Sequence, residues 1–153
     1  MTGFTPKDSN YHRRVTENFA KQTLMHTIGA RLGLVEPGRC EVILPKRDDL
    51  CQQHGFVHAG ITTTIADTAA GYAALSLMPE TAEVLSTEFK INLMNPAAGK
   101  AFIARAEVLK PGRTLTVVRS DVWAESEEGT HTLIASMLAT MISLVDNSGG
   151  SAT

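Results

Sequence analysis

The sequence predicts an α+β fold in which one antiparallel β-sheet packs against a single long helix. Between residues 58 and 77 the chain is apolar or small on nearly every face of a helix, and such a helix is buried by the elements around it. After residue 83 the chain changes to strand-like segments separated by short turns. Short turns join antiparallel neighbours, so these segments predict one sheet.

Length, charge and cysteine content exclude several classes of protein. The 153 residues fit one domain, and the formal net charge of −2 lacks the basic excess of nucleic-acid-binding proteins. No stretch approaches the ~20 apolar residues of a membrane span, and residues 1–10 lack the apolar core of a signal peptide. Cys40 and Cys51 match no zinc or redox spacing and are interpreted as reduced thiols. We therefore expect a cytoplasmic protein that binds no metal, nucleic acid or membrane.

The chain begins with a predicted amphipathic helix over residues 10–30, preceded by Asp8 and Ser9 as candidate caps. A short hairpin follows, with strands over residues 32–35 and 39–44. Residues 1–30 are assigned as a helical segment of the same domain as the sheet. The apolar positions of the helix are Val15, Phe19, Leu24 and Ile28.

The main part of the domain, residues 31–145, contains the long helix and the later strands. The helix is predicted over residues 58–77, with Pro79 as its stop. Residues 146–153 are rich in Gly and Ser and are expected to form a flexible tail. Strands are predicted over residues 83–92, 101–109, 115–124 and 132–145.

Asp67 is the most informative residue of the long helix. It is the single charged residue between Gly60 and Leu75, and no Lys or Arg occurs between Arg47 and Lys90. A buried carboxylate is costly unless it is paired or hydrogen-bonded. Asp67 is therefore either a functional acid or a structural acid satisfied by its neighbours, and the residues alone leave both open.

Helical geometry divides the residues around Asp67 between two faces. At about 100° per residue, one face carries the larger side chains and is expected to pack on the sheet. Small residues on the face of Asp67 leave room for a ligand to approach the carboxylate. The sheet-facing set is Ile61, Ile65, Thr68, Tyr72 and Leu75, and the set beside Asp67 is Gly60, Thr63, Ala70, Gly71 and Ala74.

The start of the long helix is a second candidate site. The N–H groups of Ala59 and Gly60 lack partners within the helix, and helix N-termini favour anions and oxyanions. At ~1.5 Å per residue they lie about 12 Å along the axis from Asp67. One reacting carbonyl cannot contact both groups in one chain, so a shared site requires two subunits.

Two motifs and their spacing resemble a known family. The run HGFVHAG at residues 54–60, followed by DTAAG at 67–71, is similar to the motif of hotdog-fold acyl-CoA thioesterases of the phenylacetyl-CoA thioesterase (PaaI-like) type. That family has HGG and then an acid nine residues beyond the His, as His58 and Asp67 are spaced here. The likeness continues through STEFKINLMNPA at 86–97 and GRTL at 112–115, and covers residues 32–144.

The resemblance implies catalytic roles and a hotdog fold, an antiparallel sheet wrapped around a long central helix. Asp67 corresponds to the general base or nucleophile, and the backbone N–H of Ala59 to the donor that polarises the thioester carbonyl. Where the family has an Asn six residues before the motif His, this chain has Gln52 with Gln53 beside it, and either is a candidate. Ser86 corresponds to a strand hydroxyl that supports the catalytic water in some relatives.

The resemblance also implies an acyl-CoA substrate, no metal or organic cofactor, and a homodimer with shared sites or a tetramer of such dimers. In this family the turn flanked by Lys110 and Arg113 lies near the nucleotide end of CoA, so either is a candidate phosphate contact. His58 is a candidate catalytic residue, although a structural role at the helix start is the expectation. Candidates for binding the substrate are Gly60 and, for an aryl or medium-chain acyl group, Phe56, Tyr72, Phe89 and Met94.

Two other functions remain alternatives at this stage. A non-catalytic acyl-CoA-binding protein on the same fold would need an output module, and no helix-turn-helix is visible in the sequence. A hotdog dehydratase or hydratase has a His with a Pro-Gly helix start, whereas this helix opens His58-Ala59-Gly60.

Overall fold

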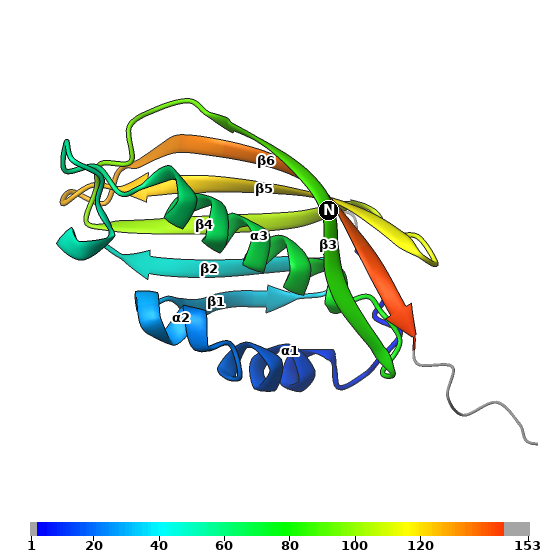
Figure 1. Ribbon diagram of the computed structural model, residues 1–153. Helices are drawn as coiled ribbons and strands as arrows, with labels where there is room; N and C mark the ends of the chain where they lie inside the picture. The colour runs from blue at the N-terminus through cyan, green and yellow to red at the C-terminus, as the bar shows by residue number, and fades with distance from the viewer. Residues whose placement is uncertain (1–2, 146–153) are drawn as a thin grey trace, which may run out of the picture.

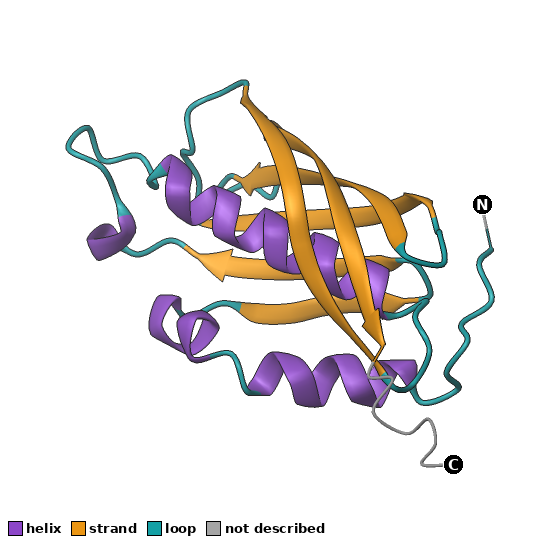
Figure 2. Cartoon of the chain, turned by 45° about the vertical axis from the view of Figure 1, so that its right-hand side comes forward, coloured by secondary structure: helices purple, strands orange, loops and turns teal. Residues whose placement is uncertain are grey.

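A six-stranded antiparallel sheet curls around one long helix, α3 (Ala59–Leu75), in the computed structural model, which describes residues 3–145 (Figures 1 and 2). The strand order is β1-β2-β4-β5-β6-β3, so β1 and β3 are the edge strands. The predicted α+β fold is confirmed. The strands are β1 (Arg31–Glu36), β2 (Arg39–Pro45), β3 (Ala82–Leu93), β4 (Ala101–Lys110), β5 (Leu115–Glu125) and β6 (His131–Val145).

The predicted elements of the main domain agree with the structure to within two residues at each end. A short 3-10 helix, η1 (Asp48–Leu50), lies between β2 and α3. No helix among residues 3–145 is long and apolar enough to cross a lipid bilayer. The expected flexible tail, residues 146–153, lies outside the described residues.

The N-terminal segment is two helices, α1 (Tyr11–Ala20) and α2 (Thr23–Ile28), and not the single helix predicted over residues 10–30. The backbone is extended at Gln22, with a ψ of 100°, and this breaks the helix. The break rotates α2, so that Met25 is buried while Leu24, predicted on the apolar face, is 51% exposed.

The buried face of α3 is wider than predicted and is centred on alanines. Ala70 and Ala74, expected beside Asp67, are fully buried, whereas Ile61 and Thr68, expected to pack on the sheet, are only partly buried. The sheet curls around the helix, so small side chains on several faces let the strands approach closely. The buried residues of α3 are Thr62, Ile65, Ala66, Ala69, Ala70, Tyr72, Ala73, Ala74 and Leu75.

Arg14 of α1 fixes the N-terminal helices to the C-terminal end of α3. The last carbonyls of a helix lack internal partners, and a cation at that end is favourable. Asn10, and not the predicted Asp8 or Ser9, is the N-cap of α1, and Asp8 instead pairs with Arg14 at 3.4 Å. The guanidinium donates to the carbonyls of Leu75 (2.7 Å), Met78 (3.1 Å) and Pro79 (2.5 Å).

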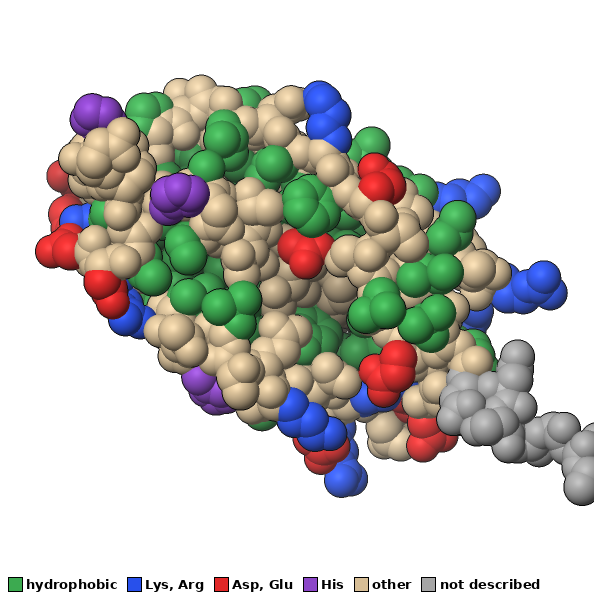
Figure 3. Space-filling model, viewed as in Figure 1, with side chains coloured by type: hydrophobic (Ala, Val, Ile, Leu, Met, Phe, Trp, Pro, Cys, Tyr) green, Lys and Arg blue, Asp and Glu red, His purple; other side chains and the backbone are tan. Residues whose placement is uncertain are grey.

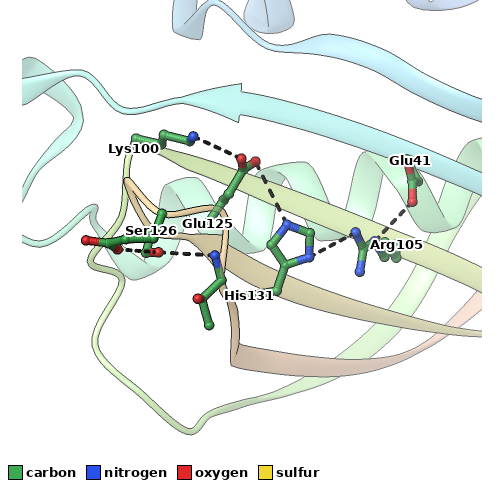
Figure 4. A network of polar contacts seen from close by, with 8 residues as sticks. Glu41, Lys100, Arg105, Glu125, Ser126 and His131 are labelled. Atoms are coloured by element: carbon green, nitrogen blue, oxygen red, sulfur yellow. Dashed lines mark hydrogen bonds and ion pairs between the residues drawn. The ribbon is translucent and has the colours of Figure 1, made fainter.

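The sheet face opposite α3 carries a chain of polar contacts (Figure 4). Arg105 donates to Glu41 at 3.0 Å, and its guanidinium lies 5.8 Å from the ring centroid of Trp123. Arg105 also contacts Nδ1 of His131 at 3.3 Å, and the other ring nitrogen of His131 lies 3.9 Å from Glu125. Arg105 lies between the buried Ala104 and Ala106, and Glu41 between the buried Cys40 and Val42, so these strands have one apolar and one polar face.

Candidate active site

Asp67 lies in the middle of α3 and faces a cavity between α3 and β3. The cavity has a volume of about 410 Å³ and contains Asp67 and Ser86 in its wall. The hydroxyl of Ser86 donates to Oδ1 of Asp67 at 2.6 Å. Asp67 is partly exposed and not enclosed by the core, and it forms no ion pair within residues 3–145. One carboxylate oxygen is therefore hydrogen-bonded and the other is left for a ligand or water.

A β-bulge in β3 aims Ser86 at Asp67. The register of β3 against β6 shifts between Ser86, opposite Met141, and Glu88, opposite Thr140, so Thr87 is the extra residue. A bulge adds one residue to a strand, so the side chains before the bulge change face relative to those after it. As a result Ser86 and Phe89 both line the Asp67 cavity, although they are an odd number of positions apart.

The start of α3 offers one free amide and not two. Nδ1 of His58, the N-cap residue, accepts the N–H of Gly60 at 2.8 Å, so this amide is already bound. The N–H of Ala59 has no acceptor within the described part of the chain. The expectation that both amides are available is therefore wrong for Gly60. His58 holds the structural position expected of it, because it caps the helix.

Ala59 lines a second cavity, also about 410 Å³, which does not include Asp67. Gln52 lines this cavity, and its side-chain oxygen accepts the N–H of His54. Gln53 is exposed and lines neither cavity. The structure thus selects Gln52 as the glutamine that lies beside Ala59.

The four apolar residues expected to line one pocket are divided between the two cavities. Phe56 and Met94 line the cavity of Ala59, whereas Tyr72 and Phe89 line the cavity of Asp67. Within one chain, the two halves of the expected catalytic site do not meet.

The cations expected near CoA lie away from both cavities. Arg113 lines a third cavity of about 270 Å³ near Pro79, beyond the C-terminal end of α3. Lys7 of the N-terminal segment lines the same cavity. Lys110 is exposed at the end of β4 and lines none of these three cavities.

Several residues in the wall of the Asp67 cavity were not singled out from the sequence. Asn18, Gln22 and Leu24 of the N-terminal helices line part of it. Thr64 and Thr68 of α3 line it as well. The two threonines are spaced so that they lie on one side of the helix near Asp67, and the sequence indicates this. Nothing in the sequence relates the N-terminal helices to this cavity.

The strand that carries Ser86 is an exposed edge. Most of β3 is accessible, and the exposed fractions of Leu85, Phe89 and Leu93 are 57%, 43% and 58%. Hydrophobic side chains gather over this part of the surface (Figure 3). A long apolar edge strand is a template for pairing with another strand.

The family follows from a comparison of the sequence with known proteins. The sequence model of the Thioesterase superfamily matches residues 54–130, which contain the helix start, Asp67 and Ser86. The chain belongs to the thioesterase superfamily. This membership confirms the family predicted from the motifs, and the hotdog fold with it.

Solved structures of thioesterases share the fold over most of the chain. A thioesterase family protein from Silicibacter pomeroyi is 50% identical, with a TM-score of 0.86 over 88% of this chain and 98% of that one. The PaaI protein of the E. coli phenylacetic acid degradation operon is 16% identical, with a TM-score of 0.78 over 90% of this chain and 96% of that one. The latter likeness concerns the fold alone.

Two relatives known from sequence carry hydrolase names. A protein named as an esterase from Saccharolobus solfataricus is 31% identical over 84 residues, which are 55% of this chain and 59% of that protein. The 1,4-dihydroxy-2-naphthoyl-CoA hydrolase of Listeria monocytogenes is 26% identical over 105 residues, 69% of this chain and 85% of that protein. This thioesterase-family chain thus resembles proteins named for ester or thioester hydrolysis.

Proposed function

We propose that the protein hydrolyses an acyl-CoA thioester to a free acid and CoA, in active sites shared between two subunits. One observation carries the proposal: the carboxylate of Asp67 and the free amide of Ala59 line separate cavities of the same chain. A thioester carbonyl that contacts both groups therefore needs a second copy of the chain. The name of the Listeria relative, a CoA thioester hydrolase, supports the same reaction class.

The two copies are proposed to pair through β3. Its outer edge has no neighbouring strand in the sheet, and its apolar side chains are exposed. Antiparallel pairing of two such strands about a twofold axis would extend the sheet and cover these side chains. It would also bring the start of α3 from one subunit toward Asp67 of the other. Two such dimers pairing through another surface would make a tetramer.

In the proposed reaction Asp67 takes a proton from water as the water oxygen attacks the thioester carbon. Ser86 donates to Oδ1 of Asp67, which leaves Oδ2 to accept from the water. The Ala59 N–H of the second subunit binds the developing oxyanion, and one such donor contributes roughly 3–4 kcal/mol when positioned. The C–S bond then breaks, the sulfur leaves as the CoA thiolate, and the proton held by Asp67 returns to it.

A direct attack by Asp67 on the thioester is the second route open to this site. It would form an anhydride between the Asp67 side chain and the acyl group, with CoA released, and water would then hydrolyse the anhydride. Side chains, backbone amides and water are sufficient in both routes, so neither needs a metal or an organic cofactor.

The remaining contacts of the substrate are proposed from the cavity walls. Gln52, beside Ala59, would orient the thioester carbonyl or the water. Phe56 and Met94 would contact the pantetheine arm or the acyl group from the second subunit. Arg113 is the stronger candidate for a CoA phosphate, because it lines a cavity that also contains Lys7.

Release of free thiol tests the proposed function directly. The purified protein is incubated with acetyl-, hexanoyl-, decanoyl- and benzoyl-CoA in the presence of a thiol reagent. We expect free CoA from at least one of them, and much less from an Asp67→Asn protein. Binding of acyl-CoA without thiol release would favour a non-catalytic acyl-CoA-binding protein. Addition or loss of water on an enoyl-CoA without thiol release would favour a hydratase or dehydratase.

A further inference from the structure

The Asp67 cavity is lined in part by residues outside the part of the chain that defines the family. Its walls come from α3, from β3 and from the two N-terminal helices. Asn18, Gln22 and Leu24 supply the last of these walls, upstream of the family match that begins at residue 54. These three residues, called the end wall, therefore lie outside the matched segment, where they can limit what the cavity holds.

A hydrogen-bonded cluster fixes the end wall to α3. Gln22 donates to the hydroxyl of Tyr72 at 2.8 Å, and that hydroxyl donates to Oδ1 of Asn18 at 3.2 Å. Burial raises the pKa of Tyr72 to about 12, so the hydroxyl stays protonated and keeps donating at neutral pH. The ring of Tyr72 also lies 6.0 Å from that of Phe19, centroid to centroid. Together with the Arg14 contacts, these interactions make the wall a fixed boundary.

Gly71 lies on α3 between Asp67 and this wall. It is four residues after Asp67, so the two share one side of the helix, and both line the cavity. Its φ is not positive, and a Cβ added to it would meet no protein atom within 4 Å. Glycine inside a helix is less stable than alanine. No contact within the described chain requires this glycine. A path for a ligand along the cavity would require it, because any side chain at this position would enter the cavity.

We propose, on the basis of the proposed thioesterase function, that the acyl group runs from Asp67 across Gly71 and ends against Asn18, Gln22 and Tyr72. Gly71 is then a specificity-determining residue that keeps the path open, and the three-residue cluster sets the greatest acyl length. A volume of about 410 Å³ is within the range of small-molecule sites. The walls along the path include Leu24, Leu85 and Phe89, which suit a medium-chain or aryl acyl group.

Substitutions at Gly71 test the path. The kcat/KM for acetyl-, hexanoyl- and decanoyl-CoA is measured for the wild type, Gly71→Ala and Gly71→Leu. Each methylene excluded from the cavity lowers kcat/KM about fourfold, so Gly71→Leu should lower the hexanoyl-to-acetyl ratio at least tenfold. Gly71→Ala should lower it less, and should raise the Tm by about 1–4 °C, because alanine is the better helix former. We therefore expect Gly71→Ala to be more stable than the wild type and to prefer shorter acyl groups.

Substitutions in the end wall test the limit on length. Gln22→Ala should raise the decanoyl-to-hexanoyl ratio of kcat/KM, since it opens the wall, whereas Lys21→Ala, an exposed neighbour that lines no part of the cavity, should leave the ratio unchanged. An equal loss with every acyl length would overturn the proposal. So would dissociation of the Gly71→Ala oligomer in sedimentation, which would assign Gly71 to a contact between subunits.

A separate measurement distinguishes this inference from the proposed function. If the wild type releases no CoA from any acyl-CoA, the thioesterase proposal fails, but binding still reports on the path. Titration calorimetry with hexyl and decyl thioethers of CoA, which cannot be hydrolysed, should then show weaker binding of both to Gly71→Leu than to the wild type. Unchanged binding of both thioethers would overturn the acyl path by itself.

Discussion

Asp67 and Ser86 meet across the cavity from different elements, and the hydrogen bond between them separates the roles of the two carboxylate oxygens. We predict that Asp67→Asn lowers kcat by ~10²–10⁴, the range expected for loss of a positioned acid or base. The fold should be retained, because Asp67 forms no ion pair in the described chain and Asn keeps its shape. Asp49→Asn, in the exposed 3-10 helix η1, is the control for loss of a surface carboxylate. Near wild-type turnover of a folded Asp67→Asn protein would contradict the assignment.

The two adjacent glutamines should differ in effect because only Gln52 lines the cavity of Ala59. We expect Gln52→Ala to lower kcat/KM at least tenfold and Gln53→Ala, on the exposed side, to change it less than twofold. Gln52 also binds the N–H of His54, so the thermal stability of both variants is measured alongside the kinetics. If neither variant loses more than about twofold, the amide has no role in the reaction.

At the scale of elements, the contact between α1 and the end of α3 is expected to be a large contributor to stability. The side chains of Arg14 and Asp8 are 18% and 4% exposed. Removal of one partner leaves a buried charge without compensation, which costs about 3–5 kcal/mol. Arg14→Met should therefore lower the free energy of unfolding by about 3 kcal/mol or more in denaturant titrations.

Arg13→Met is the control for that prediction. Arg13 is the neighbouring residue, its side chain is 78% exposed, and its pair with Glu17 is a surface i,i+4 contact. Such exposed pairs contribute little to stability, so the loss should be small. Equal losses from the two variants would mean that the Arg14 contacts at the end of α3 add nothing specific.

Periodicity and turn residues were sufficient to predict the strands and the long helix, because these elements bury continuous apolar patterns between Pro- or Gly-containing turns. The break at Gln22 was not predictable in the same way, since the polar residues there are compatible with a helix until Tyr72 provides a partner. The bulge at Thr87 has no Gly or Pro to mark it. Tertiary contacts decided both features.

The residues of the candidate site could be predicted from the sequence, but their arrangement in space could not. Asp67 and Ala59 were identified from charge isolation, helix geometry and the motif, and the separation along α3 already required two subunits. The loss of the Gly60 amide depends on the rotamer of His58, and the choice of Gln52 over Gln53 depends on the loop conformation. Residue type and spacing carry no information on either.

At the scale of the whole molecule, we predict that activity requires a dimer and that two inactive proteins complement each other. Asp67→Asn and Ala59→Pro should each be inactive as homodimers, because one lacks the base and the other lacks the oxyanion donor. In a mixed dimer one of the two sites keeps both groups. An equal mixture that exchanges subunits freely should recover about a quarter of the wild-type specific activity.

The structure makes Ala59→Pro a suitable variant for this test. Ala59 is the first residue of α3, where proline is tolerated, and its N–H has no acceptor in the described chain. The preceding residue, His58, has φ −59° and ψ 138°, which is the conformation that a following proline requires. Sedimentation and circular dichroism check that each variant folds and dimerises. A folded monomer with full activity would contradict the shared site.

The bulge at Thr87 determines where the length of this chain can vary. Side chains alternate between the two faces of a strand, and Thr87 is the extra residue in this alternation, so its deletion would leave Ser86 opposite Met141 and Glu88 opposite Thr140 in a regular ladder. Ser86 would then keep its face of the strand and its place beside Asp67. A residue lost from the exposed turn at 126–129 likewise leaves the register of β3 unchanged. Relatives that keep this chemistry can therefore differ in length at their turns and also by one residue at the bulge.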